Sequence, residues 1–266
     1  MAKFHADFEV KKGNDMNVER ITSRQNALIQ QVRKLRTSRS ERYKTGLFCA
    51  DGTKLLQEAI RWCDGLHTVL LSEDLAIPAL PEHVRVCVVP KELMEYASGM
   101  AAPQGALFLC RIPQMEKKDA LQPGTLILDG LQDPGNLGTI LRTADALQIP
   151  VVLSTGCADP YNEKTVRASM GAVFRTPPVQ MSREEVLAFC KEAGLPLAVT
   201  AMSDDAVDLR QSDCCKYAVI IGSEGQGVCK EYMDAADARL IIPMNPRCES
   251  LNAAIAAAIV MWQMKQ

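Results

Sequence analysis

The sequence predicts an α/β protein in which short apolar strands alternate with amphipathic helices. Two observations support this fold class: strand-like apolar runs recur along the chain, and segments with helical spacing separate them. A third observation divides the chain, because residues 111–124 contain two prolines, a glycine and a cluster of charges and interrupt the pattern. With 266 residues the chain has room for one large domain or two of ordinary size.

The first part of the chain predicts a small α/β domain over residues 17–112. Residues 1–16 have little periodic pattern and are expected to form a flexible extension. A capping residue, Ser23, and apolar residues at helical spacing after it predict the first helix. Further helices are expected over 53–62 and 91–97, and strands over 46–50, 67–71, 84–89 and 106–111.

After an expected linker over residues 113–123, the alternation restarts and predicts a second domain over 124–266. Its strands are near-continuous apolar runs, which is typical of strands covered on both faces in a mostly parallel sheet. These strands are expected at 125–129, 150–154, 195–201, 217–222 and 240–243. The second domain is therefore expected to be a parallel sheet with helices on both faces.

Composition limits the class of protein. An apolar content of 47% with 23% charged residues is typical of a soluble globular protein, and the longest apolar run, over 253–262, is too short to span a membrane. Ten scattered cysteines without a Cys-x-x-Cys pair predict reduced thiols and a cytoplasmic protein. We expect no signal peptide and no metal site.

One segment is strongly basic although the formal net charge of the chain is −2. Within residues 20–44, Glu41 is the single opposing charge. The cations there are Arg20, Arg24, Arg33, Lys34, Arg36, Arg39, Arg42 and Lys44. This pattern indicates a surface for phosphates, although a solvated basic helix would look the same. The low number of aromatic residues nearby favours recognition of shape and backbone over base stacking.

Three short segments of the second domain combine polar groups with a strand end or a helix start, where α/β sheets build their sites. Their sequences are NLGTILR over 136–142, IGSEGQG over 221–227 and IPMNPRCESLN over 242–252.

In the first segment, Asn136 is placed to cap a helix. Arg142 falls opposite the apolar face of that helix, so its guanidinium is free to bind an anion. In the second segment, glycines allow positive φ angles and a close approach to a ligand. In the third, Ser250 is suited to cap a last helix that is apolar nearly all round, and is therefore buried in its domain or against a second subunit. Each segment alone also fits a cap or a tight turn without a ligand.

Together and in this order, the three segments resemble motifs 1, 2 and 3 of the SpoU/TrmH group of SPOUT RNA ribose 2′-O-methyltransferases. The sequence KTVRASMGAVF over 164–174 resembles a further stretch of that family. This resemblance covers about residues 122–266. Residues 17–112 are similar to the substrate-binding domain that often precedes it, which is similar to kink-turn-binding ribosomal proteins.

The resemblance implies a parallel sheet with a trefoil knot, a homodimer, and S-adenosylmethionine bound by the knotted loops. The positions that match its cofactor site are Thr200, Ala201, Met202, Gly222, Ile242 and Leu251. Glycines and apolar side chains at such positions suit an adenine ring that lies against the backbone.

The resemblance also implies the catalytic residues. Arg142 would grip a phosphate and stabilise the developing alkoxide, since a guanidinium scarcely deprotonates. Asn136 could orient Arg142 or the ribose, and Glu224 could fix the guanidinium or the third segment. Ser250 and Asn252 could form hydrogen bonds across the site.

The implied activity is methyl transfer to a ribose 2′-hydroxyl, with ribosomal RNA of the 23S type as the favoured substrate. The residues expected to hold the RNA are Arg24, Arg33, Lys34, Arg36 and Arg39. Two alternatives stay open: the same reaction on transfer RNA, and a non-catalytic RNA-binding or ribosome-assembly protein. The joint presence of Arg142, Glu224 and Asn252 argues against the second, because a binding module does not need them.

Overall fold

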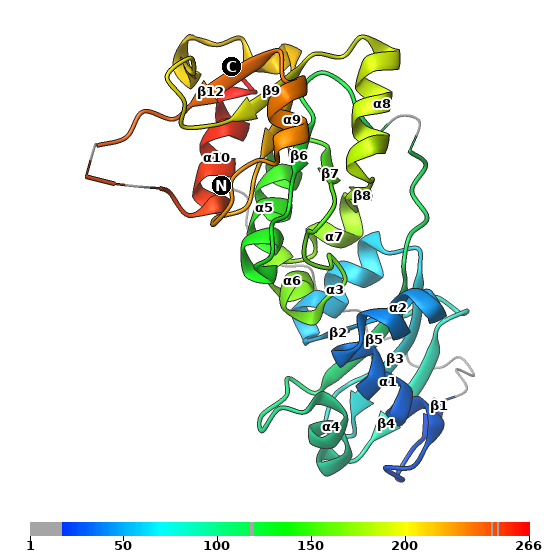
Figure 1. The fold of residues 1–266 in the computed structure, drawn as a ribbon. Coiled ribbons are helices and arrows are strands. Elements are labelled where there is room, and N and C mark those ends of the chain that lie inside the picture. Colours follow the sequence, from blue (N-terminus) through cyan, green and yellow to red (C-terminus); the bar gives the residue numbers. More distant parts are fainter. Residues whose placement is uncertain (1–17, 118–119, 246, 249) are drawn as a thin grey trace. The chain divides into compact units, whose positions relative to one another are not determined.

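A computed structural model of the protein describes residues 18–117, 120–245, 247–248 and 250–266 (Figure 1). The chain divides into two compact α/β units between Ile112 and Pro113. The extension predicted over residues 1–16 lies outside the described residues. All ten cysteines are free thiols. Within the described ranges, no helix is long and apolar enough to cross a membrane.

The N-terminal unit is built on a mixed five-stranded sheet with the order β1-β4-β3-β5-β2. Strand β5 runs antiparallel to both of its neighbours, whereas β1, β4 and β3 are parallel. The strands are β1 (Val18–Arg20), β2 (Leu47–Asp51), β3 (Leu66–Ser72), β4 (Arg85–Val89) and β5 (Ala106–Arg111). All four predicted strands are present, and β1 is an addition at the sheet edge.

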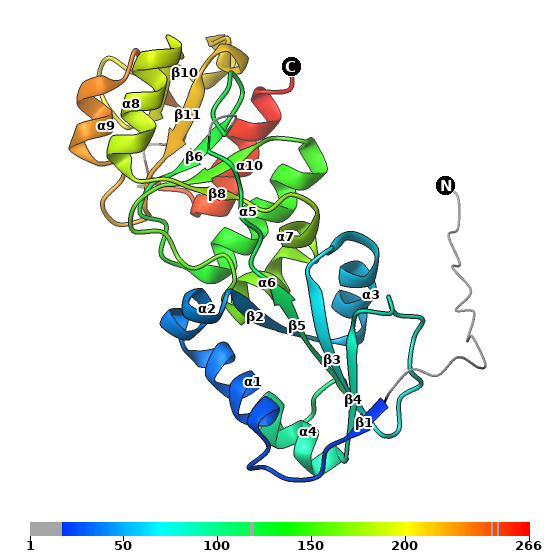
Figure 2. The same cartoon turned by 90° about the vertical axis from the view of Figure 1, so that its right-hand side faces the viewer.

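Helices cover both faces of this sheet. Figure 2 shows α1 and α4 on one face and α3 on the other. The helices are α1 (Ala27–Thr37), α2 (Arg39–Thr45), α3 (Thr53–Trp62) and α4 (Lys91–Ser98). The cap predicted at Ser23 is wrong: Asn26 caps α1, and its side chain accepts the N–H of Leu28 at 2.9 Å. The reason is that the buried stripe of α1 begins only at Leu28, while Ser23 belongs to the turn before it.

The C-terminal unit confirms the predicted parallel sheet. Its seven strands follow the order β10-β12-β9-β11-β6-β7-β8, and every pairing is parallel. The strands are β6 (Leu126–Leu128), β7 (Val151–Leu153), β8 (Val179–Gln180), β9 (Leu197–Thr200), β10 (Val207–Asp208), β11 (Ala218–Ile221) and β12 (Ala238–Ile241). The central strands β6, β7 and β11 are buried along their whole length, which accounts for their apolar runs.

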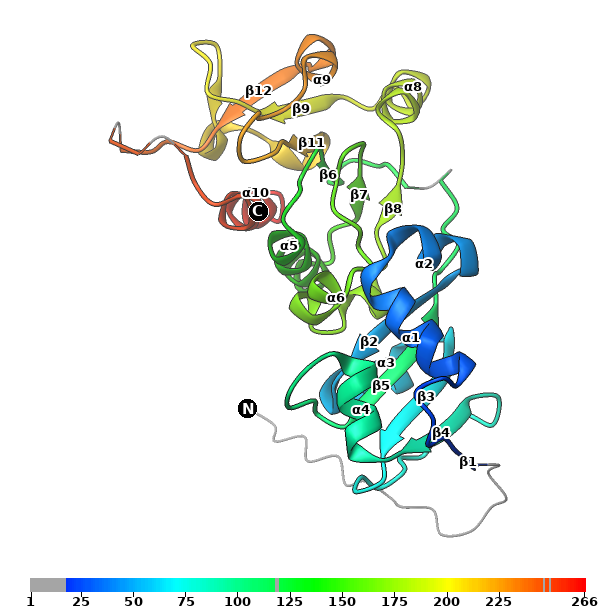
Figure 3. The ribbon, with the colours of Figure 1, turned by 60° about the horizontal axis from the view of Figure 1, so that its bottom comes forward.

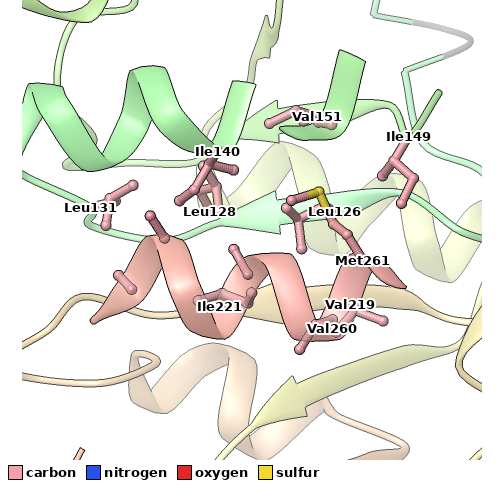
Figure 4. Close-up of a cluster of buried hydrophobic side chains, with 14 of the residues drawn as sticks. Leu126, Leu128, Leu131, Ile140, Ile149, Val151, Val219, Ile221, Val260 and Met261 are labelled. Carbon is pink, nitrogen blue, oxygen red and sulfur yellow. The ribbon is translucent and has the colours of Figure 1, made fainter. Parts of the chain in front are cut away.

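Helices α5 (Pro134–Leu147) and α10 (Ala253–Gln263) lie on one face of this sheet. Helices α8 (Arg183–Ala193) and α9 (Lys230–Ala235) lie on the other, as Figures 2 and 3 show. In Figure 4, Val260 and Met261 of α10 lie among strand residues such as Leu126 and Val219. The burial predicted for α10 is thus confirmed for one side of the helix.

Candidate active site

The first segment opens helix α5, but its cap differs from the predicted one. Asp133 caps the helix, because its Oδ1 accepts the backbone N–H of Asn136 at 2.8 Å. Pro134 at the first helical position favours this start, since proline needs no N–H there. The N–H of Asn136 and the ammonium of Lys164 hold the pKa of Asp133 below its usual value. The Asn136 side chain is therefore left for other contacts.

The glycine of the first segment serves the packing of two helices. A Cβ atom at Gly138 would lie 2.5 Å from the Thr165 carbonyl oxygen and 2.6 Å from the Ala168 Cβ. Both neighbours belong to α6 (Glu163–Ser169), which is followed by α7 (Ala172–Arg175). Only glycine lets α5 and α6 approach so closely. The sequence over 164–174 thus forms the helices that fix the position of α5.

The second segment is a tight turn directly after the buried strand β11. Ser223 and Gly227 exchange two backbone hydrogen bonds, of 3.1 and 3.0 Å. A Cβ atom at Gly222 would lie 2.0 Å from the Gly227 carbonyl carbon, so this position requires glycine. Glu224 lies exposed within the turn.

The third segment leads into α10, and again the cap differs from the predicted one. Asn252 caps this helix, with its Oδ1 accepting the N–H groups of Ala254 at 2.9 Å and Ile255 at 3.3 Å. The cap predicted at Ser250 is wrong because the helix begins at Ala253, too far along the chain for Ser250 to reach its first N–H groups. Ser250 is exposed.

One chain of hydrogen bonds joins the three segments. The Asn136 Nδ2 group donates to Glu224 Oε1 at 2.6 Å, and the Asn252 Nδ2 group donates to Asn136 Oδ1 at 3.1 Å. Asn136 is thus the central member, and Glu224 connects through it to Asn252. Residues 116 positions apart in the chain meet in this way.

Arg142 does not belong to this chain of hydrogen bonds. It is exposed on α5, as its helical position predicted, while Leu141 beside it is buried. Arg142 forms no hydrogen bond or ion pair with any described residue. Of the two roles considered for Glu224, contact with the third segment is seen within this chain, through Asn136.

A cavity of about 460 Å³ lies between the second and third segments and the end of β9. All six positions of the expected cofactor site line it: Thr200, Ala201, Met202, Gly222, Ile242 and Leu251. Glu224 and Ser250 add polar groups, while Val228, Met233 and Met244 are apolar wall residues that the sequence reasoning missed. Apolar walls with a few polar groups fit a nucleoside cofactor such as S-adenosylmethionine.

A second cavity, of about 620 Å³, lies on the other side of the glycine-rich turn. Asp129, which directly follows β6, is 1% exposed and lines it. Its carboxylate accepts the Arg183 Nε–H and the Cys229 backbone N–H, each at 3.0 Å. The sequence reasoning missed this cavity, although an acidic residue at the carboxyl end of a buried strand was a usable signal.

The basic segment of the N-terminal unit gathers around aromatic rings. The guanidinium groups of Arg24 and Arg33 lie 4.8 and 4.0 Å from the centre of the Tyr96 ring, and Arg39 lies 5.5 Å from that of Tyr43. The expectation of few aromatics is corrected here, because α4 brings Tyr96 from a distant part of the sequence.

Arg36 and Arg42 of this segment donate hydrogen bonds to backbone carbonyls. The prediction that Arg42 is a surface cation is wrong, because Arg42 is only 2% exposed. Its Nη1 donates a hydrogen bond of 2.6 Å to the carbonyl of Leu35, near the end of α1. The Nη1 of Arg36 donates to the Ala97 carbonyl at 3.0 Å, which ties α1 to α4. Arg24, Arg33, Lys34 and Arg39 are exposed. The set of exposed basic residues in this segment is thus smaller than the sequence predicted.

Comparison with known proteins decides the family. Residues 123–262 match the model of the SpoU rRNA methylase family, and residues 26–107 match that of the MRM3-like substrate-binding domain. The chain belongs to the SpoU rRNA methylase family. The resemblance drawn from the three segments is thereby confirmed, as is the expectation of an S-adenosylmethionine-dependent RNA 2′-O-methyltransferase.

Relatives match over most of their length. A Bacillus subtilis protein named 23S rRNA (guanosine(2553)-2′-O)-methyltransferase RlmP is 32% identical over 93% of this chain and 100% of its own. The crystal structure of an AdoMet-bound rRNA methyltransferase from Sinorhizobium meliloti has a TM-score of 0.82 at 28% identity, covering 93% of this chain and 97% of that one. The SpoU methyltransferase AviRb from Streptomyces viridochromogenes, in complex with AdoMet, has a TM-score of 0.79 at 25% identity, with coverages of 90% and 98%.

Proposed function

We propose that this protein methylates the ribose 2′-hydroxyl of a guanosine in 23S ribosomal RNA, as a cytoplasmic homodimer. The observation that carries the proposal is the hydrogen-bond chain from Glu224 through Asn136 to Asn252, at the edge of a cavity that suits S-adenosylmethionine. The Bacillus subtilis relative, which matches over its full length, supplies the substrate class.

The cavity residues would hold the cofactor through shape and backbone contacts. Gly222 lets the turn close tightly beside the cavity, while Ile242 and Leu251 offer apolar surface. S-adenosylmethionine, when bound there, supplies a methyl group from a sulfonium. The chain from Glu224 to Asn252 fixes the edge of this cavity, where a ribose must lie if its 2′-oxygen is to approach that methyl in line.

Arg142 has a separate task in this proposal. A ribose hydroxyl is a very weak acid, so the site must stabilise the negative charge that builds on its oxygen as the proton passes to the adjoining RNA phosphate. That oxygen then bonds to the methyl carbon as the S–C bond breaks and the neutral thioether leaves. A guanidinium keeps its proton and binds a phosphate with two parallel hydrogen bonds. Arg142 is exposed and has no partner among the described residues, which leaves it available for the RNA backbone.

The outer side of α10 supports the homodimer. Ile255, Ile259 and Trp262 are 54%, 39% and 60% exposed. Their spacing places them on one side of the helix, opposite the buried Ala257 and Met261. A second copy that covers this stripe would bring its own Arg142 to the site. We also propose that the segment before α10 forms a trefoil knot, as the family resemblance implies.

The N-terminal unit would hold the RNA in this proposal. Arg24, Arg33, Lys34 and Arg39 are exposed on and around α1 and α2, whereas Arg36 adds its charge while it ties α1 to α4. Tyr96 packs against two of these guanidinium groups and limits their motion. The match to a substrate-binding domain supports this role. We also propose that this unit is similar to kink-turn-binding ribosomal proteins, as the sequence resemblance implies.

The test is methyl transfer by the purified protein to RNA from cells that lack it. Methyl-labelled S-adenosylmethionine is added to 23S rRNA and, separately, to transfer RNA, and the RNA is digested to nucleosides. We expect label in 2′-O-methylguanosine from 23S rRNA. Label in transfer RNA alone would support the alternative in which the same reaction acts on transfer RNA. RNA binding without transfer would support a non-catalytic protein, and label on a base would contradict the reaction.

A further inference from the structure

We infer that the second cavity binds the base of the target nucleotide and that Arg183 recognises it. This inference rests on the proposed function. It concerns the cavity of about 620 Å³ that lies beside the cofactor cavity, a size within the range of ~300–1,000 Å³ typical of small-ligand sites.

The position of the cavity suits the base of a nucleotide whose ribose receives the methyl group. The glycine-rich turn separates the two cavities. The residues that line both are Ser223, Glu224, Gln226, Gly227 and Val228. A base on one side of this thin wall would place its ribose at the edge of the wall, where Glu224 and Asn136 meet. Methyl donor and acceptor would then meet at that edge.

The lining suits a flat ring. Four of the residues around the cavity are glycines: Gly130, Gly156, Gly225 and Gly227. Gly130 and Gly156 have φ angles of +67° and +84°, and a Cβ at Gly156 would lie 3.3 Å from the Gly130 Cα. These two backbones therefore lie against one another and leave a wall without side chains. Such a wall lets a base removed from its stack lie against backbone.

Arg183 is held in a fixed orientation at this cavity. Its Nε donates to Asp129, whose second carboxylate oxygen is occupied by the Cys229 N–H. The Arg183 side chain is 29% exposed, whereas that of Asp129 is 1% exposed. Neither terminal nitrogen of Arg183 has a hydrogen-bond partner among the described residues. A buried carboxylate thus fixes a guanidinium whose two remaining donor groups are unused.

The charge of the lining favours a neutral base over a phosphate. Arg183 and Lys230 supply two positive charges, and Asp129 and Glu224 supply two negative ones. The Cys229 thiol adds no charge at neutral pH, because burial raises its pKa to about 11. A site without net charge does not concentrate anions. Two parallel donors from one arginine match the O6 and N7 acceptors of guanine.

The test replaces Arg183 with lysine, which keeps the charge beside Asp129 and removes the two parallel donors. The matched control is Arg175→Lys, since Arg175 is a similarly half-buried arginine whose Nε donates to Asp145 at 2.8 Å. We expect Arg183→Lys to lower kcat/KM on 23S rRNA about tenfold or more. Its cofactor Kd and melting temperature should match those of the wild type. Arg175→Lys should leave all three quantities unchanged.

A second arm of the experiment removes a hydrogen-bond acceptor from the RNA and leaves the donors of Arg183 in place. 23S rRNA transcribed with 7-deazaguanosine lacks the guanine N7. On this RNA the wild-type enzyme should lose more of its kcat/KM than Arg183→Lys does, and the ratio between the two enzymes cancels any effect on RNA folding. An equal loss in both enzymes would overturn the inference.

Other outcomes separate the inference from the proposed function. Undiminished transfer by Arg183→Lys would overturn the inference and leave the function intact. A higher cofactor Kd in that variant would also overturn it, because the cavity would then hold the amino-acid end of the cofactor. No transfer by the wild-type protein would refute the function itself.

Discussion

The two units hold their functional side chains in different ways. In the C-terminal unit, Asn136 bonds to Glu224 and Asn252, and Gly222 has no room for a side chain. In the N-terminal unit, Arg24 and Arg33 stay exposed, and their guanidinium groups lie over the face of one tyrosine ring. The first arrangement fixes geometry, whereas the second mainly presents charge.

This difference matches the task that we propose for each unit. Methyl transfer requires the oxygen, carbon and sulfur to lie in line, and a misplacement of about 1 Å can cost ~10²-fold in rate, so a site whose residues are fixed by one another suits it. Attraction of phosphates tolerates small displacements and is weakened by salt. We therefore expect substitutions at the site of the C-terminal unit to change the methyl-transfer rate or cofactor binding at any salt concentration. Substitutions of the exposed arginines in the N-terminal unit should change RNA affinity in a salt-dependent way.

The largest effect is expected from Arg142→Ala. Removing a group that stabilises developing charge should lower kcat by about 10²–10³-fold. Cofactor Kd should be unchanged, because Arg142 lines neither described cavity. Single-turnover transfer and cofactor titration measure the two quantities. Equal loss of both would refute the role given to Arg142.

A second test concerns the steric requirement at Gly222. In Gly222→Ala the added Cβ would lie 2.0 Å from backbone, so the turn must open. We expect a loss of about 1–3 kcal/mol in the free energy of unfolding and at least a tenfold weaker cofactor Kd. Gly225→Ala is the matched control for these two quantities, since its Cβ meets no atom within 4 Å. Identical behaviour of the two variants would contradict a sterically fixed turn.

The central member of the hydrogen-bond chain gives the next largest effect. Asn136→Asp places two carboxylates together and removes the donor to Glu224, so kcat/KM should fall by roughly tenfold to a hundredfold. Asn136→Ala removes the same bond without repulsion and should lose less. If both variants lose the same amount, the contact between Asn136 and Glu224 does not position the site.

A smaller, salt-dependent effect is expected in the N-terminal unit. Arg24→Gln with Arg33→Gln should weaken RNA binding and reduce the slope of log K against log salt by about 0.7–0.9 for each phosphate that is no longer neutralised. The control removes two positive charges from α3, on the other face of the same sheet, with Lys54→Gln and Arg61→Gln. Equal slopes for the two double variants would exclude a defined RNA surface around Tyr96.

The smallest effect concerns the cap of α5. Asp133→Ala should cost about 1 kcal/mol in the free energy of unfolding at pH 7. The folded-state pKa of Asp133 is lowered by the Asn136 N–H and by Lys164, so its contribution is present above the unfolded pKa. It should disappear as the pH falls through the lower folded value. Urea unfolding at several pH values measures the difference in the free energy of unfolding between the wild type and Asp133→Ala. A difference that stays the same at every pH would contradict this linkage.

The sequence predicted those strands and helices that are marked by an apolar pattern within a single segment of the chain. Buried strands such as β6, β7 and β11 were found because both faces are covered and the apolar runs are continuous. Strands β8 and β10, of two residues each, are too short for a periodic signal. Helix α8 was missed although its capping box, Ser182 with Glu185, was readable in the sequence.

Contacts between distant residues could not be predicted from local patterns. Asn136 and Asp133 are both good capping residues, and the proline after Asp133 was the signal that decides between them. The burial of Arg42 depends on the break at Ser38 between α1 and α2, which lets its guanidinium reach the Leu35 carbonyl near the end of α1. The six cofactor positions came from family resemblance, because no periodicity links Thr200 to Leu251.

The most direct test of the central claim is a map of ribose methylation in ribosomal RNA from cells that lack this protein. The same cells are supplied with the wild-type chain or with Arg142→Ala. We predict that one guanosine ribose of 23S rRNA loses its methyl group in the deletion strain. The wild-type chain should restore the methyl group, and Arg142→Ala should not. An unchanged ribose map, or full restoration by Arg142→Ala, would contradict the account.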